Sequence, residues 1–361
     1  YVLLIAYNSD LGRLSMELSE LLGFAVKNGA SDIHVTAGLP PLIRIDGEIR
    51  RIKVDLLPDH QVLEMITGIM TDGQRKEFEE YWECDFAFEI PNVARFRVNA
   101  FNQGRGPAAA FRVVPTEVLT LEQINAPAIF REMSEKPRGM VLVTGPTGSG
   151  KSTTLAAMID YVNSTLQGHI LTLEDPIEFV HESKKCLVNQ REVGRHTQSF
   201  SAALKSALRE DPDIILVGEM RDVETISLAL TAAETGHLVF GTLHTSSAAK
   251  TIDRIIDVFP ADQQDMVRAM LSESLQGVVA QRLLKKPEGG RCAAYEIMTG
   301  TPAIRNLIRE AKIPQIYGMI QVGREFGMVT MDQSLEDLVS RNMIDIATAR
   351  VLATEPEKFG G

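Results

Sequence analysis

The stretch at positions 140–154, MVLVTGPTGSGKSTT, limits the possible folds of this chain more than any other. A short apolar run comes first, then the pattern G-x-x-x-x-G-K-S, and then residues 154–159, which favour a helix. This order predicts a strand, a phosphate-binding loop and a helix. The glycines allow successive backbone N–H groups to turn towards a polyphosphate, where the helix dipole adds positive potential. The alternative, a glycine-rich turn that binds nothing, is disfavoured because loop, Lys-Ser pair and flanking elements agree.

Two side chains of this loop are predicted to contact a bound nucleotide. Lys151 would reach the β- and γ-phosphates, and the Ser152 hydroxyl would hold Mg²⁺. ATP and Mg²⁺ are therefore the predicted ligands. The other residues predicted to bind the nucleotide are Gly145, Pro146, Thr147, Gly148, Ser149, Gly150 and Thr153.

Composition disfavours several classes of protein. The chain has 361 residues, of which 44% are hydrophobic and 24% charged, which suits two or three globular domains. No apolar run approaches the ~20 residues of a membrane span, so a cytoplasmic location is expected. A formal net charge of −11 disfavours a surface that follows a nucleic-acid backbone. Cys84, Cys186 and Cys292 form no CxxC pair and are expected to be reduced, buried thiols.

Patterning along the chain predicts a division into regions. Residues 1–15 are expected to be a non-native or disordered extension. Residues 16–115 combine alternating, strand-like segments with helical ones and predict a small α+β domain. Residues 116–136, bracketed by prolines, are the expected connector. Residues 137–300 alternate strand and helix patterns, as in a parallel sheet flanked by helices, and residues 301–361 are predicted to be helical.

Individual elements follow from the same patterns. In the first domain, residues 59–81 are predicted to be helical. In the second, the expected strands are 140–144, 169–173, 214–217 and 238–242, with 277–280 and 293–297 as further candidates. Open α/β sheets bind ligands beyond the carboxyl ends of their strands, so residues that follow these strands are the candidates for chemistry.

Carboxylates follow two of these strands. Hydrolysis of a nucleotide needs one carboxylate to orient water and another for the metal shell. Glu219 follows an apolar strand in a Walker B-like pattern and is the predicted Mg²⁺ group, partly through water; the alternative is that it only caps the next helix. Glu174 ends another strand and is the predicted general base. Asp175 and Glu178 beside it could equally be turn and capping residues.

His244 follows a third strand. A lone histidine at such a place is more often a partner of a backbone carbonyl than a sensor of the γ-phosphate. A second histidine, His237, precedes the strand, and Lys250, Asp253 and Arg254 follow it. This grouping favours a role for His244 in sensing or in coupling between subunits.

The phosphate loop, the acidic box at 174–178, the strand end at 218–222 and the box at 242–245 occur in this order. Together they resemble the secretion ATPase superfamily of type II secretion and type IV pilus systems, from about Met16 to the end of the chain. The segment AIRNLIRE at 303–310 resembles the C-terminal signature of the pilus retraction ATPases. A missing tetracysteine zinc module and only about 100 residues before the connector disfavour the assembly and secretion motors.

The resemblance implies a RecA-like P-loop ATPase core with a small N-terminal α+β (PAS-like) domain and a C-terminal helical region. It also implies a function, that of a homohexameric motor that hydrolyses ATP to power type IV pilus retraction, pilin disassembly and twitching motility. The alternatives are an accessory retraction paralogue, a type II secretion or pilus assembly ATPase, and a RecA-like nucleic-acid translocase, which the acidic charge disfavours.

The resemblance further implies partners and additional site residues. The motor would be cytoplasmic, peripheral at the inner face of the inner membrane, docked without membrane insertion on a PilC-like platform protein, and without a nucleic-acid partner. In the superfamily, arginines of the N-terminal domain approach the nucleotide, and the matching positions are Arg97 and Arg112. Both lie in strand-like segments, where an outward arginine could equally belong to a solvated face.

Overall fold

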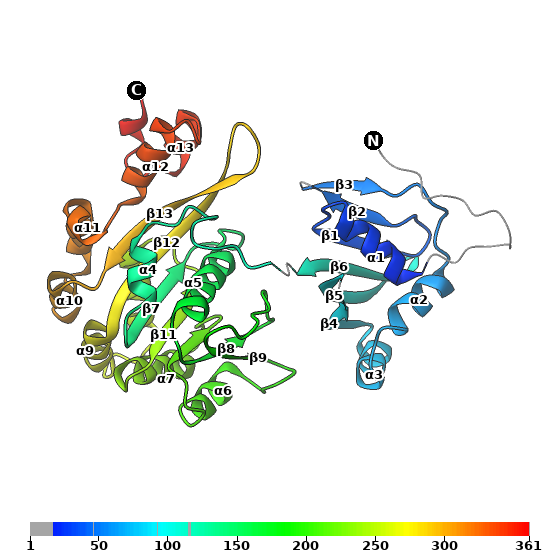
Figure 1. Ribbon diagram of the computed structural model, residues 1–361, viewed down its shortest axis with the longest axis horizontal. Helices are drawn as coiled ribbons and strands as arrows, with labels where there is room; N and C mark the ends of the chain where they lie inside the picture. Colours follow the sequence, from blue (N-terminus) through cyan, green and yellow to red (C-terminus); the bar gives the residue numbers. More distant parts are fainter. Residues whose placement is uncertain (1–16, 46, 92, 115–116, 361) are drawn as a thin grey trace. The chain divides into compact units, whose positions relative to one another are not determined.

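The computed structural model describes residues 17–45, 47–91, 93–114 and 117–360 (Figure 1). These residues form two compact units, and the second begins at Glu117. Each unit has its own sheet and hydrophobic core. The extension expected at 1–15 lies outside the described residues.

Six antiparallel strands form the sheet of the N-terminal unit, in the spatial order β3-β2-β1-β6-β5-β4. Alternate residues of a strand point to opposite faces, so Phe96 and Val98 of β5 are buried while Arg97 is exposed. The apolar face forms a core with the helices. The elements are α1 (Leu18–Lys27), β1 (Asp32–Thr36), β2 (Leu42–Ile45), β3 (Glu48–Arg51), α2 (Asp59–Thr67), α3 (Asp72–Tyr81), β4 (Glu83–Ile90), β5 (Ala94–Gln103) and β6 (Gly106–Val114).

The single helical stretch expected at 59–81 is in fact two helices, α2 and α3. The Thr71 hydroxyl accepts a hydrogen bond from the Gln74 backbone N–H at 3.4 Å, and the Gln74 side chain accepts one from the Thr71 N–H at 2.9 Å. This reciprocal capping box starts a new helix. The sequence Thr-Asp-Gly-Gln therefore interrupts a run that otherwise favours helix.

The sheet of the second unit has seven strands in the order β13-β12-β7-β11-β10-β8-β9, all parallel except β13. The elements are α4 (Ile129–Ser134), β7 (Gly139–Thr144), α5 (Lys151–Thr165), β8 (His169–Glu174), β9 (Leu187–Glu192), α6 (Phe200–Ala207), β10 (Ile214–Val217), α7 (Val223–Glu234), β11 (Leu238–Leu243), α8 (Ala248–Asp257), α9 (Gln264–Ser274), β12 (Leu275–Lys285), β13 (Arg291–Thr299), α10 (Pro302–Arg309), η1 (Ile313–Gln315), α11 (Ile316–Val322), η2 (Arg324–Phe326), α12 (Met331–Ser340), α13 (Ile346–Leu352) and η3 (Pro356–Phe359).

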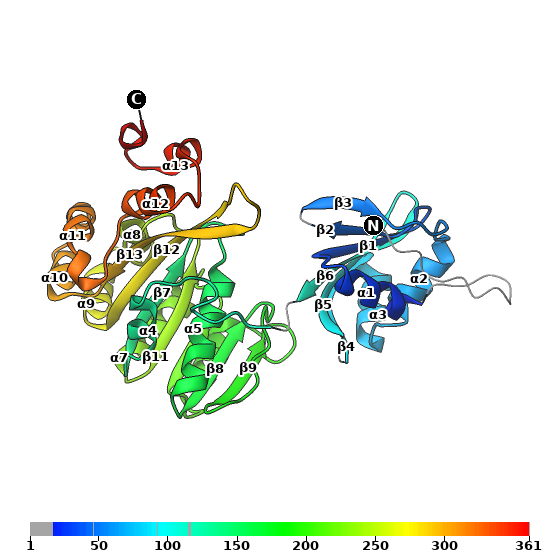
Figure 2. The ribbon, with the colours of Figure 1, turned by 45° about the horizontal axis from the view of Figure 1, so that its top comes forward.

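Helices cover both faces of this sheet. Every residue of β7 is buried, as is typical of a parallel strand covered on both sides. Its Met140 and Leu142 belong to the core that contains α6 to α9, whereas Val141 and Val143 belong to the core that contains α4 and α5. The C-terminal helices add a smaller core, in which α12 lies against β13 (Figure 2).

The expected fold class is confirmed, and the six predicted strand positions of the second unit all lie in strands. Strand β9 was missed because four of its six residues are polar or charged, namely Asn189, Gln190, Arg191 and Glu192. Such a polar edge strand gives little hydrophobic signal. Among the described residues, no helix is both long and apolar enough to cross a bilayer.

Candidate active site

The phosphate loop joins β7 to α5. Gly145, Gly148 and Gly150 have φ angles of 146°, 78° and 88°, a region of backbone space that disfavours residues with a Cβ. A Cβ on Gly145 would also lie 2.4 Å from the backbone oxygen of Gln281, whereas one on Gly148 would meet open space. The loop is therefore closely fitted to the sheet on one side and open on the other.

Two features of this loop suit a phosphate group. The Ser149 hydroxyl is buried and has no hydrogen-bond partner among the described residues. No side chain caps α5, because its N-cap residue is Gly150, so the N–H groups of its first turn face outwards without a side-chain acceptor. A phosphate at this helix terminus would supply acceptors for both.

Lys151 is half-buried at the start of α5. Its Nζ donates hydrogen bonds to the backbone oxygens of Gly145, at 2.9 Å, and Pro146, at 3.2 Å. Burial lowers the pKa of Lys151, and the nearby charge of Glu219 opposes this shift. Because an anionic oxygen is a stronger acceptor for an ammonium group than a neutral carbonyl, the position suits phosphate binding.

Glu219 follows β10 and contacts two potential cations. Its Oε1 lies 2.5 Å from Nε of Arg221 and 3.1 Å from Nε2 of His244. Partial burial would raise the pKa of Glu219, but the Arg221 hydrogen bond and the electrostatic influence of His244 and Lys151 bring it below its usual value. Glu219 is thus held as a carboxylate, the form that a metal shell requires.

Asp222, rather than Glu219, caps helix α7. The backbone N–H of Thr225 donates to Asp222 Oδ1 at 2.8 Å, and the Thr225 hydroxyl donates to Oδ2 at 2.7 Å. The alternative in which Glu219 serves only as the cap of this helix is therefore wrong.

Glu174 ends β8, and its side chain is buried. Its Oε1 accepts hydrogen bonds from the Thr172 hydroxyl at 2.6 Å and from Gln190 Nε2 at 3.2 Å. Its Oε2 accepts one from the Glu178 backbone N–H at 3.4 Å. Burial raises the pKa of Glu174, and these donors only partly offset the effect. A carboxylate with a raised pKa is suited to accept a proton.

Gln190 holds the acidic segment that follows Glu174. Besides its bond to Glu174, its Nε2 donates to the Phe179 backbone oxygen at 2.8 Å, and its Oε1 accepts from the His181 backbone N–H at 2.8 Å. Asp175 and Glu178 within this segment are exposed. Gln190 was not identified from the sequence because an amide on a polar edge strand carries no motif.

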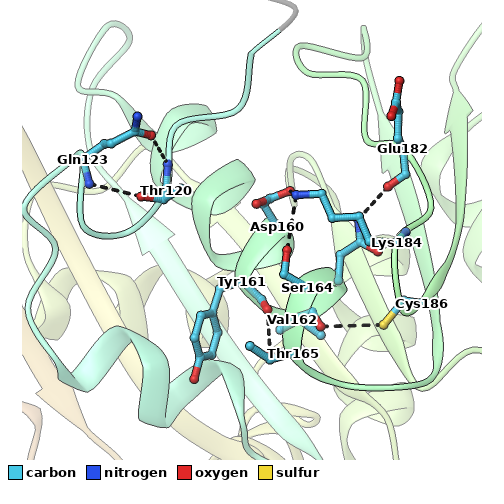
Figure 3. A network of polar contacts seen from close by, with 11 residues as sticks. Thr120, Gln123, Asp160, Tyr161, Val162, Ser164, Thr165, Glu182, Lys184 and Cys186 are labelled. Atoms are coloured by element: carbon cyan, nitrogen blue, oxygen red, sulfur yellow. Dashed lines mark hydrogen bonds and ion pairs between the residues drawn. The ribbon is translucent and has the colours of Figure 1, made fainter.

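The loop beyond the acidic segment is tied to α5, the helix that begins with Lys151 (Figure 3). Lys184 Nζ binds Asp160 Oδ1 at 2.7 Å and Ser164 Oγ at 3.2 Å. The side chain of Asn163 binds the backbone of Glu182 at 2.7 Å and that of Lys184 at 3.0 Å. These bonds connect the phosphate loop and the Glu174 segment through the body of the same helix.

The two histidines around β11 have different environments. His237 Nδ1 lies 3.0 Å from the backbone oxygen of Ala232, so it has the carbonyl partner that is usual for a structural histidine. His244 is partly exposed and contacts Glu219 instead. The Thr242 hydroxyl donates to the Gly218 backbone oxygen, and the Met220 N–H donates to the Thr242 oxygen at 3.1 Å.

Arg97 and Arg112 lie in the N-terminal unit, as directly opposite residues of β5 and β6. Both are exposed on the polar face of the sheet. Arg112 Nε binds Asp32 Oδ1 at 2.9 Å, whereas Arg97 has no partner among the described residues. Two opposed arginines are unfavourable for a sheet unless an anion is near, and Asp32 neutralises only one of them.

A family described as "Type II/IV secretion system protein" matches residues 8–352. The "Type IV pilus retractation ATPase PilT" of Pseudomonas aeruginosa is 65% identical over 95% of this chain and 100% of its own length. The "Twitching motility protein" of Neisseria gonorrhoeae is 63% identical over 91% of this chain and 90% of its own. The crystal structure of the pilus retraction motor PilT with bound ADP has a TM-score of 0.90 and 48% identity, covering 95% of this chain and 98% of that one.

Proposed function

The chain belongs to the type II/IV secretion system protein family, and from this premise we propose that it is the ATPase motor that powers type IV pilus retraction and so twitching motility. The arrangement of the sheet in the second unit is the observation that most strongly supports ATP hydrolysis as the motor's reaction. The strands β7, β11, β10 and β8 are neighbours in the sheet, and at their carboxyl ends lie the phosphate loop, His244, Glu219 and Glu174. The carboxyl ends of four parallel strands thus bring the phosphate loop and these three candidate side chains to one edge of the sheet.

The proposed reaction is hydrolysis of ATP to ADP and phosphate. The backbone N–H groups of the loop and Lys151 bind the phosphates. Glu174 accepts a proton as water attacks the γ-phosphorus and the bond to the bridging oxygen breaks. Ser152 and Glu219 would hold Mg²⁺, partly through water, and the ion would supply positive charge beside the phosphate oxygens. His244, which contacts Glu219, would respond to the γ-phosphate.

We propose a homohexamer in which one subunit completes the site of the next. Arg97 and Arg112 would approach the neighbour's nucleotide and stabilise charge on the γ-phosphoryl group. Arg97 is the stronger candidate, because Arg112 already binds Asp32. An isolated subunit would then hydrolyse ATP poorly. The motor would lie at the inner face of the inner membrane and dock on a PilC-like platform protein.

The AIRNLIRE segment forms most of α10, and its two arginines have different surroundings. The Arg305 guanidinium donates to the backbone oxygens of Gly300, at 2.8 Å, Leu275, at 2.9 Å, and Glu273, at 2.5 Å, so it fixes the helix to the junction between α9 and β12. Arg309 lies at the surface and pairs with Glu273 at 2.6 Å. A variant that tests a surface role of this helix should therefore change Arg309 and leave Arg305 intact.

A complementation experiment tests the proposal. A strain from which the gene for this chain has been deleted would receive the wild-type chain, Lys151→Ala or Arg309→Ala. We expect retraction from the first only, with ATP hydrolysis lost in Lys151→Ala and kept in Arg309→Ala. Normal retraction in the null strain would instead indicate an accessory paralogue, and ATPase activity stimulated by DNA would indicate a translocase.

A further inference from the structure

Gln281 of β12 lies directly beneath the phosphate loop, although it belongs to none of the sequence motifs. Its side chain is 3% exposed, and its Oε1 accepts a hydrogen bond from the Thr154 hydroxyl at 2.8 Å. Thr154 is itself 1% exposed and lies in the first turn of α5. A buried polar pair therefore joins the sheet to the turn whose N–H groups face the phosphate position.

The same residue contacts both ends of the loop. A Cβ on Gly145 would lie 2.4 Å from the Gln281 backbone oxygen, and a Cβ on Gly150 would lie 2.8 Å from its Nε2. Gly145 and Gly150 are the first and last glycines of the loop motif. Both have positive φ and leave no room for a Cβ beside Gln281, so the loop can pack this closely on Gln281 only with glycine at these positions.

Gln281 is in turn held from the neighbouring strand. Its partner across the β12–β13 pair is Tyr295, which is 6% exposed. Burial raises the pKa of Tyr295 to about 12, and a hydrogen bond with the Thr154 side chain partly offsets this. The Tyr295 backbone N–H donates to Ser334 Oγ of α12 at 3.0 Å. The acceptor of Thr154 is therefore embedded in a hairpin that is fixed on its far side.

We propose that Gln281 is a positioning residue for nucleotide binding, which acts through Thr154 to hold the phosphate loop and the first turn of α5 in their binding geometry. The inference rests on the proposed function of this loop. Without the amide, the buried Thr154 hydroxyl loses its acceptor on β12 and keeps only its contact with Tyr295 of β13, so the first turn can shift relative to β12. The N–H donors then no longer converge on the phosphates. Binding suffers in the ground state and in the transition state alike, so KM rises while kcat changes little.

Gln281→Met removes the amide at nearly constant side-chain length. In the full-length protein we expect KM for ATP and Kd for a fluorescent ADP analogue to rise about tenfold, and kcat to fall less than about threefold. The matched control is Gln276→Met on the same strand. This variant also loses an amide hydrogen bond, to the Arg138 backbone oxygen at 2.8 Å, but Gln276 lies at the start of β12, next to Gly139 and not to the phosphate loop. The control should keep the wild-type KM, and both variants should show similar thermal unfolding.

Variants of Thr154 test whether Gln281 acts on nucleotide binding through the Thr154 hydroxyl. They give an answer even if Gln281→Met does not fold. Thr154→Ser keeps the hydroxyl and should keep the wild-type KM, whereas Thr154→Val should raise it about tenfold. The double variant Gln281→Met with Thr154→Val should be no more than about twofold worse than either single variant, because both remove the same contact.

Three results would overturn the proposal: equal KM values for Gln281→Met and Gln276→Met, equal KM values for Thr154→Ser and Thr154→Val, or full additivity in the double variant. Lys151→Ala, assayed in the same experiments, distinguishes failure of the positioning role of Gln281 from failure of the proposed ATPase function. If Lys151→Ala abolishes hydrolysis while Gln281→Met behaves as its control does, only the positioning role fails. If Lys151→Ala binds and hydrolyses ATP normally, the phosphate loop itself is not the site.

Discussion

Glu174 and Glu219 lie at the carboxyl ends of adjacent parallel strands, β8 and β10, yet their surroundings move their pKa values in opposite directions. Glu174 is buried, which disfavours its charged form, and its neutral hydrogen-bond donors only partly offset this effect. Glu219 is partly exposed and faces Arg221 and His244, so its charged form is favoured. The same residue type therefore suits proton acceptance at one strand end and cation binding at the next.

The largest expected effect is that of Glu174→Gln. We predict a fall in kcat of about 1000-fold, because an amide cannot accept the proton of the attacking water, while nucleotide affinity is kept. Steady-state hydrolysis and fluorescent ADP binding would measure the two quantities. Glu178→Gln, at an exposed neighbouring carboxylate, is the control and should retain nearly full activity. Full turnover by Glu174→Gln would show that the two strand-end carboxylates do not differ in this way.

Glu219→Gln should lower hydrolysis by about 100-fold at limiting Mg²⁺, with partial recovery as the Mg²⁺ concentration is raised. The reason is that an amide oxygen binds a divalent cation more weakly than a carboxylate does. A titration of activity against Mg²⁺ would measure this, with Glu234→Gln at the exposed end of α7 as the control. A Mg²⁺ dependence unchanged from the wild type would remove Glu219 from the metal shell.

The pH dependence of kcat tests whether the pKa of Glu174 is raised, as the comparison with Glu219 requires. Because the pKa of Glu174 is raised, the base is lost by protonation at a higher pH than an ordinary glutamate would require, so kcat should fall early on the acid side. Gln190→Leu removes a donor to the charged form and should move this acid limb upward by roughly one pH unit. Asn189→Leu changes an exposed amide that contacts His169 and should leave the limb in place. If the acid limbs of the kcat–pH profiles coincided for the two variants, Gln190 would have no influence on the pKa of Glu174.

The smallest effect concerns stability alone. Asp222→Ala should lower the free energy of unfolding by about 1 kcal/mol, because it removes the side-chain acceptors at the start of α7. Chemical denaturation would measure this change. Glu219→Gln should leave the unfolding free energy nearly unchanged, and the reverse pattern would mean that Glu219 rather than Asp222 supports the helix.

Much of this site could be predicted because its signals are local in sequence. The phosphate loop, Glu174 and Glu219 each lie at or just after the end of an apolar strand, and β-strand order then brings the strand ends together. His244 was selected because it follows its strand, but the contacts of the two histidines could not be predicted, and the structure shows that His237 has a backbone partner whereas His244 contacts Glu219.

Other parts could not be predicted because they depend on tertiary contacts. Thr154 and Gln281 are 127 residues apart, and nothing near Gln281 in the sequence indicates that it lies under the loop. Gln190 likewise meets Glu174 only because β9 pairs with β8. The boundary at Thr71 required recognition of a capping box within a run of helix-favouring residues.

Thr242 forms hydrogen bonds with the backbone on either side of Glu219, and these bonds determine how the distance between Glu219 and His244 responds to ionic strength. Gly218 and Met220 are both joined to Thr242, which lies two residues before His244. The backbone segments that hold Glu219 and His244 are therefore joined by hydrogen bonds, and the two side chains stay close whether or not they attract each other. Added salt would screen that attraction, as it does for partly exposed charges, but it would not separate the two groups.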